Sequence, residues 1–363
     1  MKKIHPKESI RNLISYRPSV SDDKKTGVIR LSVNEGALGP SPKAIKELRK
    51  WALSDYFFHR YPDQINKKLI HAISSQYSLN PEQIVLGNGS DELIQLLSTA
   101  FIDSEEEAIY TEYGFLVFPQ SIKIAGGKPI VAADKKFTVD VNEILKLTTN
   151  KTKLIFLANP NNPTGTMIPK ADIEKLIRGI KKSTLLVIDS AYAEYVENSD
   201  YTDGAMFVEN FPNVVMLRTF SKIHGLASLR LGWAYCPIEI SQVLKSIRAP
   251  FSVNSLATIA GTAAIKDIKF QKKSLIHNRI WKDWTVKELV KEGIEVLPSV
   301  TNFFLINLLS EKNANNAISF LEENKIYVRG MKPYNLSSYI RVSLGNESEM
   351  RKFTKKLIQF CKK

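Results

Sequence analysis

Seven short apolar runs, separated by longer helical stretches, constrain the fold of this chain more than any other feature of its sequence. This alternation is typical of a mostly parallel sheet with helices on both faces. We therefore predict an α/β fold with a mostly parallel seven-stranded sheet, and we expect its functional side chains at the carboxyl ends of the strands. The predicted strands lie at residues 84–86, 107–110, 129–132, 154–158, 185–188, 214–218 and 231–235.

The pattern changes after Pro250, which indicates a second, smaller domain. A long helical stretch passes through Trp281 and Leu289 and leads to further apolar segments, which predicts an α+β lobe. A length of 363 residues is also typical of about two domains. The predicted division is an amino-terminal arm with part of the small domain at 1–35, the large domain at 36–250 and the small carboxyl-terminal domain at 251–363.

Lys222 follows one predicted strand and is flanked by groups that suit a cofactor carrying both an aldehyde and a phosphate. A lysine amine forms a Schiff base with an aldehyde. The hydroxyls of Thr219 and Ser221 and the forked guanidinium of Arg230 suit a phosphate. Pyridoxal phosphate is such a cofactor. By itself the segment is weak evidence, because lysine is abundant in this chain and is usually solvated.

Two other strand ends carry polar side chains that fit the ring of the same cofactor. The strand at 185–188 leads to Asp189, and a buried carboxylate is costly unless it is paired. A pyridinium nitrogen is a fitting partner, because the protonated ring accepts electrons from a carbanion. A helix N-cap or a salt bridge is the structural alternative for Asp189. The strand at 154–158 runs into a turn that holds Asn162, whose amide suits a phenolate oxygen.

A glycine turn after the first predicted strand offers a phosphate site. Gly89, Ser90 and Asp91 stand between that strand and a helical apolar pattern. The exposed N–H groups of a helix start suit a phosphate, and the helix dipole adds to the attraction. Such turns are common, so this motif carries weight only beside the others.

Together these motifs resemble those of the fold-type I pyridoxal phosphate enzymes, specifically the class-II aminotransferase branch that contains histidinol-phosphate aminotransferase. The resemblance covers nearly the whole chain, from residues 11–13 to 340–345. It implies a fold-type I transferase architecture. It also implies that Lys222 carries the cofactor, that Asp189 binds the ring nitrogen and that Tyr113 covers the ring. The implied partners of the phenolic oxygen are Asn162 and Tyr192. The implied phosphate ligands are Gly89, Ser90, Asp91, Thr219, Ser221 and Arg230.

The resemblance further implies a homodimer with shared active sites. In this family a tyrosine at the position of Tyr61 reaches the phosphate of the neighbouring subunit. The substrate contacts implied by the resemblance are Tyr16, Asn34, Arg329 and Arg341, and two guanidiniums suit a phosphate ester better than a single carboxylate. Residues 34–37 and Ser228 depart from the usual family pattern, which leaves the substrate preference open.

The reaction implied by the resemblance is transamination of histidinol phosphate with 2-oxoglutarate, giving imidazole acetol phosphate and glutamate in histidine biosynthesis. Lys222 acts in it as the base that moves a proton. An aromatic-amino-acid aminotransferase and a lyase similar to threonine-phosphate decarboxylase remain alternatives, because the sequence does not reveal the substrate pose. A binding protein without turnover would have no need to keep Lys222, Asp189 and Asn162 together.

Composition argues against several other classes of protein. Cys236 and Cys361 are too few and too scattered for a metal site or a disulfide framework, so we predict no metal and a cytoplasmic location. No apolar run approaches the roughly 20 residues of a membrane span. The net charge of +14 is spread along the chain, so we predict small-molecule substrates and no nucleic-acid or membrane partner.

Overall fold

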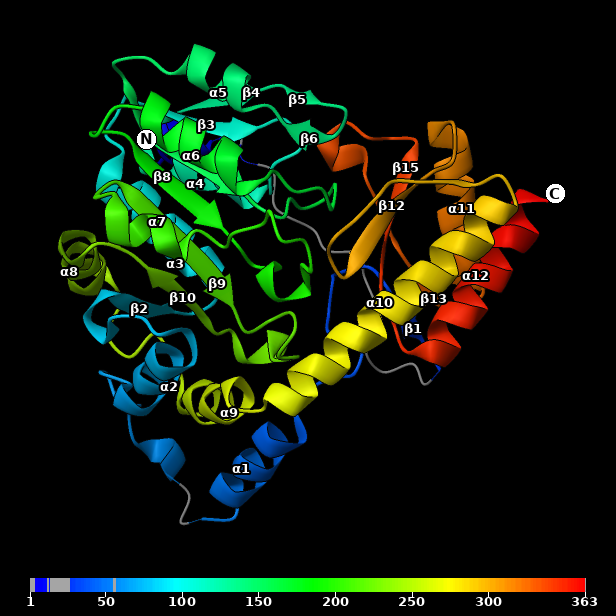
Figure 1. Ribbon diagram of the computed structural model, residues 1–363, viewed down its shortest axis with the longest axis horizontal. Coiled ribbons are helices and arrows are strands. Elements are labelled where there is room, and N and C mark those ends of the chain that lie inside the picture. The colour runs from blue at the N-terminus through cyan, green and yellow to red at the C-terminus, as the bar shows by residue number, and fades with distance from the viewer. Residues whose placement is uncertain (1–3, 12, 14–26, 55–56, 363) are drawn as a thin grey trace.

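The computed structural model describes residues 4–11, 13, 27–54 and 57–362. These residues form a large lobe around a seven-stranded sheet and a smaller lobe around a four-stranded sheet (Figure 1). The predicted α/β class, with a large lobe followed by a smaller α+β lobe, is confirmed.

The large sheet is mostly parallel and has the strand order β2-β10-β9-β8-β7-β3-β4. Strand β10 runs antiparallel to β2 and β9, whereas the other neighbouring pairs are parallel. Every strand overlaps its predicted range. The bounds are β2 (Ile84–Gly87), β3 (Glu107–Thr111), β4 (Lys128–Ala132), β7 (Thr152–Ala158), β8 (Leu185–Asp189), β9 (Val214–Thr219) and β10 (Gly232–Tyr235).

Apolar cores lie on both faces of this sheet, because successive side chains of a strand point to opposite sides. In β7, Ile155 and Leu157 join one core, and Leu154 and Phe156 join the other. With both faces covered, the strand ends are where polar groups gather. The first core is covered by α1 (Pro42–Ala52), α2 (Lys67–Tyr77), α5 (Val141–Leu147), α6 (Lys170–Gly179), α7 (Ala205–Asn210) and α9 (Ser255–Ile265), and the second by α3 (Ser90–Phe101), α4 (Val117–Ala125) and α8 (Ile238–Ile247).

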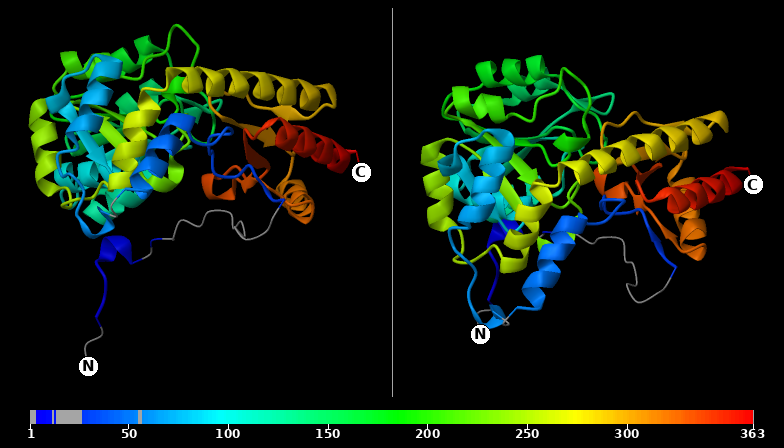
Figure 2. Two further views of the ribbon diagram at one scale, coloured as in Figure 1. Left: turned by 90° about the horizontal axis from the view of Figure 1, so that it is seen from below. Right: turned by 60° about the horizontal axis from the view of Figure 1, so that its bottom comes forward.

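The small lobe packs three helices around an antiparallel sheet with the order β11-β12-β15-β14. Helix α10 (Ile268–Lys291) starts beside α9 of the large lobe and reaches into the small lobe, where it lies along α12 (Figure 2). The remaining bounds are α11 (Glu311–Glu323), α12 (Glu347–Cys361), β11 (Glu295–Val296), β12 (Phe303–Asn307), β14 (Arg329–Gly330) and β15 (Tyr339–Ser343).

Shorter elements complete the chain. Strand β1 (Ile29–Arg30) pairs in parallel with β13 (Ile326–Tyr327) of the small lobe. A hairpin of β5 (Asp134–Lys135) and β6 (Thr138–Val139) follows β4. The 3-10 turns are η1 (Glu8–Ile10), η2 (Phe57–His59), η3 (Pro81–Gln83), η4 (Ala193–Tyr195), η5 (Ala227–Leu229) and η6 (Lys332–Tyr334).

The packing bears on where the two lobes divide. Ile29 and Leu31 lie in the small-lobe core, so we propose, as from the sequence, that part of residues 1–35 belongs to that lobe. Helix α9 instead packs on α1 and α2, and its Ala257 and Ala260 join the large-lobe core. We propose that the large lobe extends past the predicted limit at residue 250 to Asp267, immediately before α10.

Three observations on the described residues complete the fold. Their helices include none with the length and apolar character required to cross a membrane. They contain no group of three or more His, Cys, Asp or Glu side chains placed to hold a metal ion. Cys236 is buried and Cys361 is exposed, and both are free thiols.

Candidate active site

Most of the predicted site residues line one cavity of about 310 Å³. The cavity opens where β7, β8 and β9 end, as expected for an open α/β sheet. It is lined by the predicted residues Asn34, Ser90, Asp91, Asn162, Asp189, Tyr192, Thr219, Ser221, Lys222, Arg230 and Arg341. Sequence reasoning missed other lining residues, among them Val33, Glu35, Phe115 and Val117.

Asp189 is a buried carboxylate at the end of β8. Its Oδ1 accepts the backbone N–H of Ala191 at 3.1 Å. Burial raises the pKa of Asp189 to about 7, even though that N–H and the Lys222 ammonium favour the charged form. The carboxylate therefore attracts any cationic group that enters the cavity.

Lys222 and Asn162 reach the cavity from the ends of β9 and β7, the two strands that flank β8 in the sheet. Lys222 Nζ donates to the carbonyl oxygen of Val33 at 3.5 Å and lies 5.6 Å from the centroid of the Tyr192 ring. Asn162 Oδ1 accepts a bond from Arg341 Nη1 at 2.6 Å. Because its oxygen is engaged in this way, the Asn162 amide is oriented by the arginine and retains its N–H groups as donors.

Gly89 and Arg230 form a narrow corner of the site at the start of α3. Arg230 Nη2 lies 3.2 Å from Asp91 Oδ2, and Nη1 donates to the carbonyl oxygen of Ala227 at 3.0 Å. A Cβ at Gly89 would lie 2.4 Å from Arg230 Nη2, and Gly89 also has a φ of +81°. Only glycine fits there, so the helix N-terminus and the guanidinium approach the same space.

The two predicted substrate arginines lie opposite each other on adjacent strands. Arg329 of β14 is the register partner of Arg341 of β15, so their side chains share one face of the small sheet. Both side chains are buried. Arg341 also donates through Nη2 to the carbonyl oxygen of Ser32 at 3.0 Å.

The residues found to line the cavity, within the described ranges, do not include Gly89, Tyr61, Tyr113 or Arg329. Tyr61 is 81% exposed and stacks on Phe251, with the ring centroids 4.5 Å apart. Tyr113 stacks instead on Phe137, with the ring centroids 5.7 Å apart. The predicted substrate contact Tyr16 lies outside the described residues.

Comparison with known proteins relates the chain to a family. The sequence profile described as Aminotransferase class I and II matches residues 26–357. The chain belongs to this family. A histidinol-phosphate aminotransferase of Maricaulis maris is 41% identical over 364 residues, which cover 99% of each chain. One from Paramagnetospirillum magneticum is 42% identical over 324 residues, which cover 89% of this chain and 88% of the relative.

Solved structures show the same aminotransferase fold. The histidinol-phosphate aminotransferase of Sinorhizobium meliloti, in complex with pyridoxal-5'-phosphate, has a TM-score of 0.91 at 24% identity and covers 99% of this chain and 98% of that chain. An aspartate aminotransferase of Thermotoga maritima has a TM-score of 0.81 at 20% identity, with 93% and 92% covered. The fold-type I architecture predicted from the sequence is confirmed.

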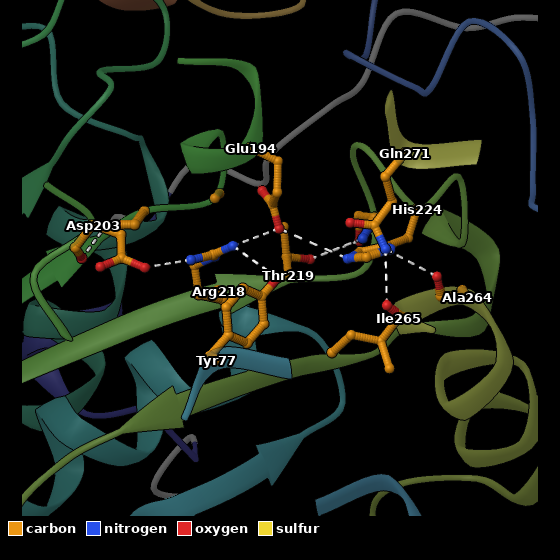
Figure 3. A network of polar contacts seen from close by, with 12 residues as sticks. Tyr77, Glu194, Asp203, Arg218, Thr219, His224, Ala264, Ile265 and Gln271 are labelled. Atoms are coloured by element: carbon orange, nitrogen blue, oxygen red, sulfur yellow. Dashed lines mark hydrogen bonds and ion pairs between the residues drawn. The ribbon is translucent and has the colours of Figure 1, made fainter. Parts of the chain in front are cut away.

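Sequence reasoning missed a buried ion-pair network of this aminotransferase, which is centred on Arg218 (Figure 3). Arg218 of β9 donates to Glu194 Oε1 at 2.7 Å, to Asp203 Oδ2 at 2.5 Å and to the Tyr77 hydroxyl at 3.1 Å. Its guanidinium carbon also lies 4.8 Å from the centroid of the Tyr77 ring. No spacing in the sequence predicts these three partners, which come from three separate segments of the chain.

The same network reaches the loop that carries Lys222. His224 Nε2 lies 3.7 Å from the Glu194 oxygen that Arg218 binds. Burial lowers the pKa of His224 to about 4, so its imidazole is neutral at neutral pH. Glu194 belongs to η4, which follows Tyr192 directly, so this carboxylate links the backbone next to Tyr192 with the loop of Lys222.

Proposed function

We propose that this aminotransferase transfers the amino group of histidinol phosphate to 2-oxoglutarate, which gives imidazole acetol phosphate and glutamate in histidine biosynthesis. The observation that carries the proposal is the convergence of Lys222, Asp189 and Arg341 on one cavity. Similarity over whole chains to proteins named histidinol-phosphate aminotransferase supports this substrate over an aromatic amino acid or a phosphorylated threonine.

Pyridoxal phosphate fits the residues of the cavity. The buried Asp189 carboxylate, with its raised pKa, is stabilised by a cation, and a protonated pyridine nitrogen supplies one. The corner of Gly89 and Arg230 admits no Cβ unless the guanidinium moves, and it suits a phosphate at a helix N-terminus. We assign the phosphate to Gly89, Ser90, Asp91, Thr219, Ser221 and Arg230, the phenolic oxygen to Asn162 and Tyr192, and the ring face to Tyr113.

When bound, the cofactor supplies a ring that accepts the electron pair left on a carbon after loss of a proton. Lys222 Nζ, as a neutral amine, would take that proton from the substrate carbon that bears the nitrogen and would deliver it to the cofactor carbon that carried the aldehyde. The Asp189 carboxylate, held in place by the N–H of Ala191, would favour a positive charge at the ring nitrogen. Tyr192 and Asn162 orient the ring by hydrogen bonds.

The anionic end of the substrate is assigned to the arginines of the small sheet. Arg329 and Arg341 share a face of that sheet, and two guanidiniums suit the phosphate ester of histidinol phosphate. We assign Asn34 and Tyr16 to the same substrate, Asn34 because it lines the cavity and Tyr16 from the sequence resemblance.

An absorbance spectrum of the purified protein tests both cofactor and reaction. We expect the band of the lysine-bound cofactor to disappear when histidinol phosphate is added, and pyridoxamine phosphate and imidazole acetol phosphate to form. Lys222→Arg is the matched control, because it keeps a positive charge but cannot form the covalent link. A colourless wild-type protein would refute the cofactor assignment.

Two competing substrates decide the specificity. Phenylalanine is expected to give a much lower kcat/KM than histidinol phosphate, because it lacks the phosphate that the arginine pair binds. Threonine phosphate is expected to release no carbon dioxide. Equal kcat/KM values for phenylalanine and histidinol phosphate, or carbon dioxide release from threonine phosphate, would overturn the proposed substrate.

We also propose that the enzyme is a cytoplasmic homodimer in which Tyr61 contacts the phosphate bound by the partner subunit. Tyr61, Phe58 and Ile65 are 81%, 65% and 60% exposed on one short segment, and large exposed apolar side chains suit an interface. The two free cysteines support a reducing compartment.

Mixing two inactive variants tests the shared site. A hybrid dimer of Tyr61→Ala and Lys222→Ala subunits has one site with both defects and one site with neither. We expect activity to return on mixing, up to about half of the wild-type level per hybrid dimer. No recovery, in hybrids verified by mass, would place Tyr61 in the site of its own subunit.

A further inference from the structure

Residues 32–34 form a short segment that contacts three residues of the active site. Its first carbonyl oxygen accepts a bond from Arg341 Nη2 at 3.0 Å, and its second accepts one from Lys222 Nζ at 3.5 Å. The amide of Asn34 donates to the Tyr192 hydroxyl oxygen at 2.9 Å. One segment therefore contacts Arg341, which is assigned to the substrate, Lys222, which is assigned to proton transfer, and Tyr192, which is assigned to the phenolic oxygen of the cofactor.

Asn34 is held in a fixed position by the small lobe. It is 2% exposed and has a φ of 58°, a conformation that asparagine tolerates better than most residues. Its backbone N–H donates to Ser343 Oγ at 2.8 Å, and Ser343 Oγ donates to Asn34 Oδ1 at 3.0 Å. Asn302 Nδ2 donates to the carbonyl oxygen of Asn34 at 3.2 Å. Ser343 and Asn302 both belong to the small lobe.

These contacts fix which way the Asn34 amide faces. Ser343 Oγ has a single proton, and the Oδ1 of Asn34 is its acceptor. If the Nδ2 and Oδ1 atoms of Asn34 exchanged places, Ser343 Oγ would face two donors, the backbone N–H and the Nδ2 group of Asn34. The Ser343 hydroxyl proton would then lose Oδ1 as its acceptor. The Nδ2 group therefore faces Tyr192, and the Tyr192 hydroxyl must direct its own proton to a different acceptor.

We propose that Asn34 is a positioning residue, which donates to Tyr192 and thereby aims the Tyr192 hydroxyl proton at the bound cofactor while the small lobe is docked. The proposal rests on the proposed function, in which Tyr192 binds the phenolic oxygen of pyridoxal phosphate. It goes beyond the substrate contact assigned to Asn34, because both polar ends of its amide are engaged by protein groups. Asn34 joins Tyr192 of the large lobe to Ser343 of the small lobe, so docking of the lobes sets the hydroxyl direction.

Nuclear magnetic resonance of the cofactor-free protein tests the Asn34–Tyr192 contact directly. With the ring carbon bonded to each hydroxyl labelled in all 13 tyrosines, Tyr192→Phe identifies the Tyr192 signal by its loss. We expect Asn34→Asp to move that signal, because a carboxylate accepts the hydroxyl proton instead of donating to the oxygen. Asn34→Gly fits the φ of 58° and is expected to move it less. An unmoved Tyr192 signal in both variants refutes the contact.

A double-mutant cycle on cofactor affinity tests whether Asn34 acts through Tyr192. We expect Asn34→Gly to weaken binding of pyridoxal phosphate about tenfold alone, but less than about twofold in a Tyr192→Phe background, since a hydrogen bond of this kind is worth about one decade. Equal losses in both backgrounds would leave Asn34 a purely structural residue and overturn the proposal.

Two neighbours of Asn34 provide the control and the test of lobe docking. Asn302→Ala loosens the same segment without touching Tyr192, so its effect on affinity is expected to be equal in both backgrounds. Ser343→Ala frees the Asn34 amide and is expected to show part of the coupling to Tyr192. If Asn34→Gly is coupled to Tyr192→Phe in the affinity cycle but Ser343→Ala is not, the dependence on the small lobe is refuted. If the protein binds no pyridoxal phosphate at all, the proposed function fails, whereas the resonance experiment still decides the contact.

Discussion

Asp189→Asn should make the cofactor-free protein more stable and the cofactor-bound protein less stable. The substitution keeps the shape of the side chain, and the asparagine oxygen can still accept the N–H of Ala191. What it removes is a buried negative charge whose burial raises the pKa of Asp189 from 3.8 to about 7. Removal of that charge should therefore relieve a desolvation penalty that exists only when the carboxyl is ionised.

The size of the penalty follows from the raised pKa. A shift of about three units corresponds to about 4 kcal/mol, which we take as an upper value. Between the two pKa values the folded protein keeps a proton that the unfolded chain has released, so rising pH favours unfolding. The penalty is absent below about pH 4, grows by about 1.4 kcal/mol per pH unit, and is complete above about pH 7.

Urea unfolding of the cofactor-free proteins, at the same protein concentration, measures the difference in the free energy of unfolding between Asp189→Asn and wild type. We expect Asp189→Asn to unfold with nearly the wild-type free energy near pH 4, and to be more stable by about 2–4 kcal/mol near pH 8. Asp134→Asn is the matched control, because burial also raises the pKa of Asp134 to about 7. It should show the same trend with pH.

Saturating pyridoxal phosphate separates the two variants. Wild type should then become the more stable protein relative to Asp189→Asn, because the carboxylate has gained its cationic partner and bound ligand stabilises the folded state. The order of Asp134→Asn and wild type should not reverse. A difference between Asp189→Asn and wild type that does not change with pH, or that keeps its sign when the cofactor binds, would refute this account of Asp189.

Three further substitutions test the packing of the site. Gly36→Ala puts a Cβ 2.8 Å from the carbonyl oxygen of Lys222, so we expect a loss of about 1–3 kcal/mol in the free energy of unfolding by urea, and an unchanged midpoint would contradict the close approach. Gly89→Ala forces Arg230 aside, so the affinity for pyridoxal phosphate measured by titration should fall at least about tenfold. Unaltered affinity would argue against assigning the phosphate to the corner of Gly89 and Arg230. Arg218→Met leaves Glu194 buried without its cation, so we expect the free energy of unfolding to fall by about 3 kcal/mol or more. Adding Glu194→Gln should restore part of that loss, and no restoration would show that the ion pair is unimportant.

The large lobe was predictable from the sequence because its strands are buried on both faces. Such strands are continuous apolar runs, and the run at residues 154–158 corresponds to the buried strand β7. The polar residues that follow these runs meet at one edge of a parallel sheet. Asn162, Asp189 and Lys222 could therefore be grouped without knowledge of their contacts, and the structure brings them to one cavity.

Contacts between distant segments could not be predicted in this way. Asn34 and Tyr192 are 158 residues apart, and Asn34 and Ser343 are 309 apart. Their pairing depends on how the small lobe docks, and no local period or turn signal records that. The same holds for Arg218, which lies inside an apolar strand pattern although it binds Glu194.

Asp189 and Glu194 show how neighbouring buried acids take on different tasks. Glu194 is bound by Arg218, so its charge is compensated inside the protein whether or not a ligand is present. Asp189 receives a backbone N–H, and its raised pKa shows that this contact and the Lys222 charge do not offset its burial. A cation in the cavity therefore gains more from Asp189 than from Glu194. It follows that loss of the Arg218–Glu194 pair should destabilise the protein with or without the cofactor, whereas the sign of the Asp189→Asn effect should depend on the cofactor.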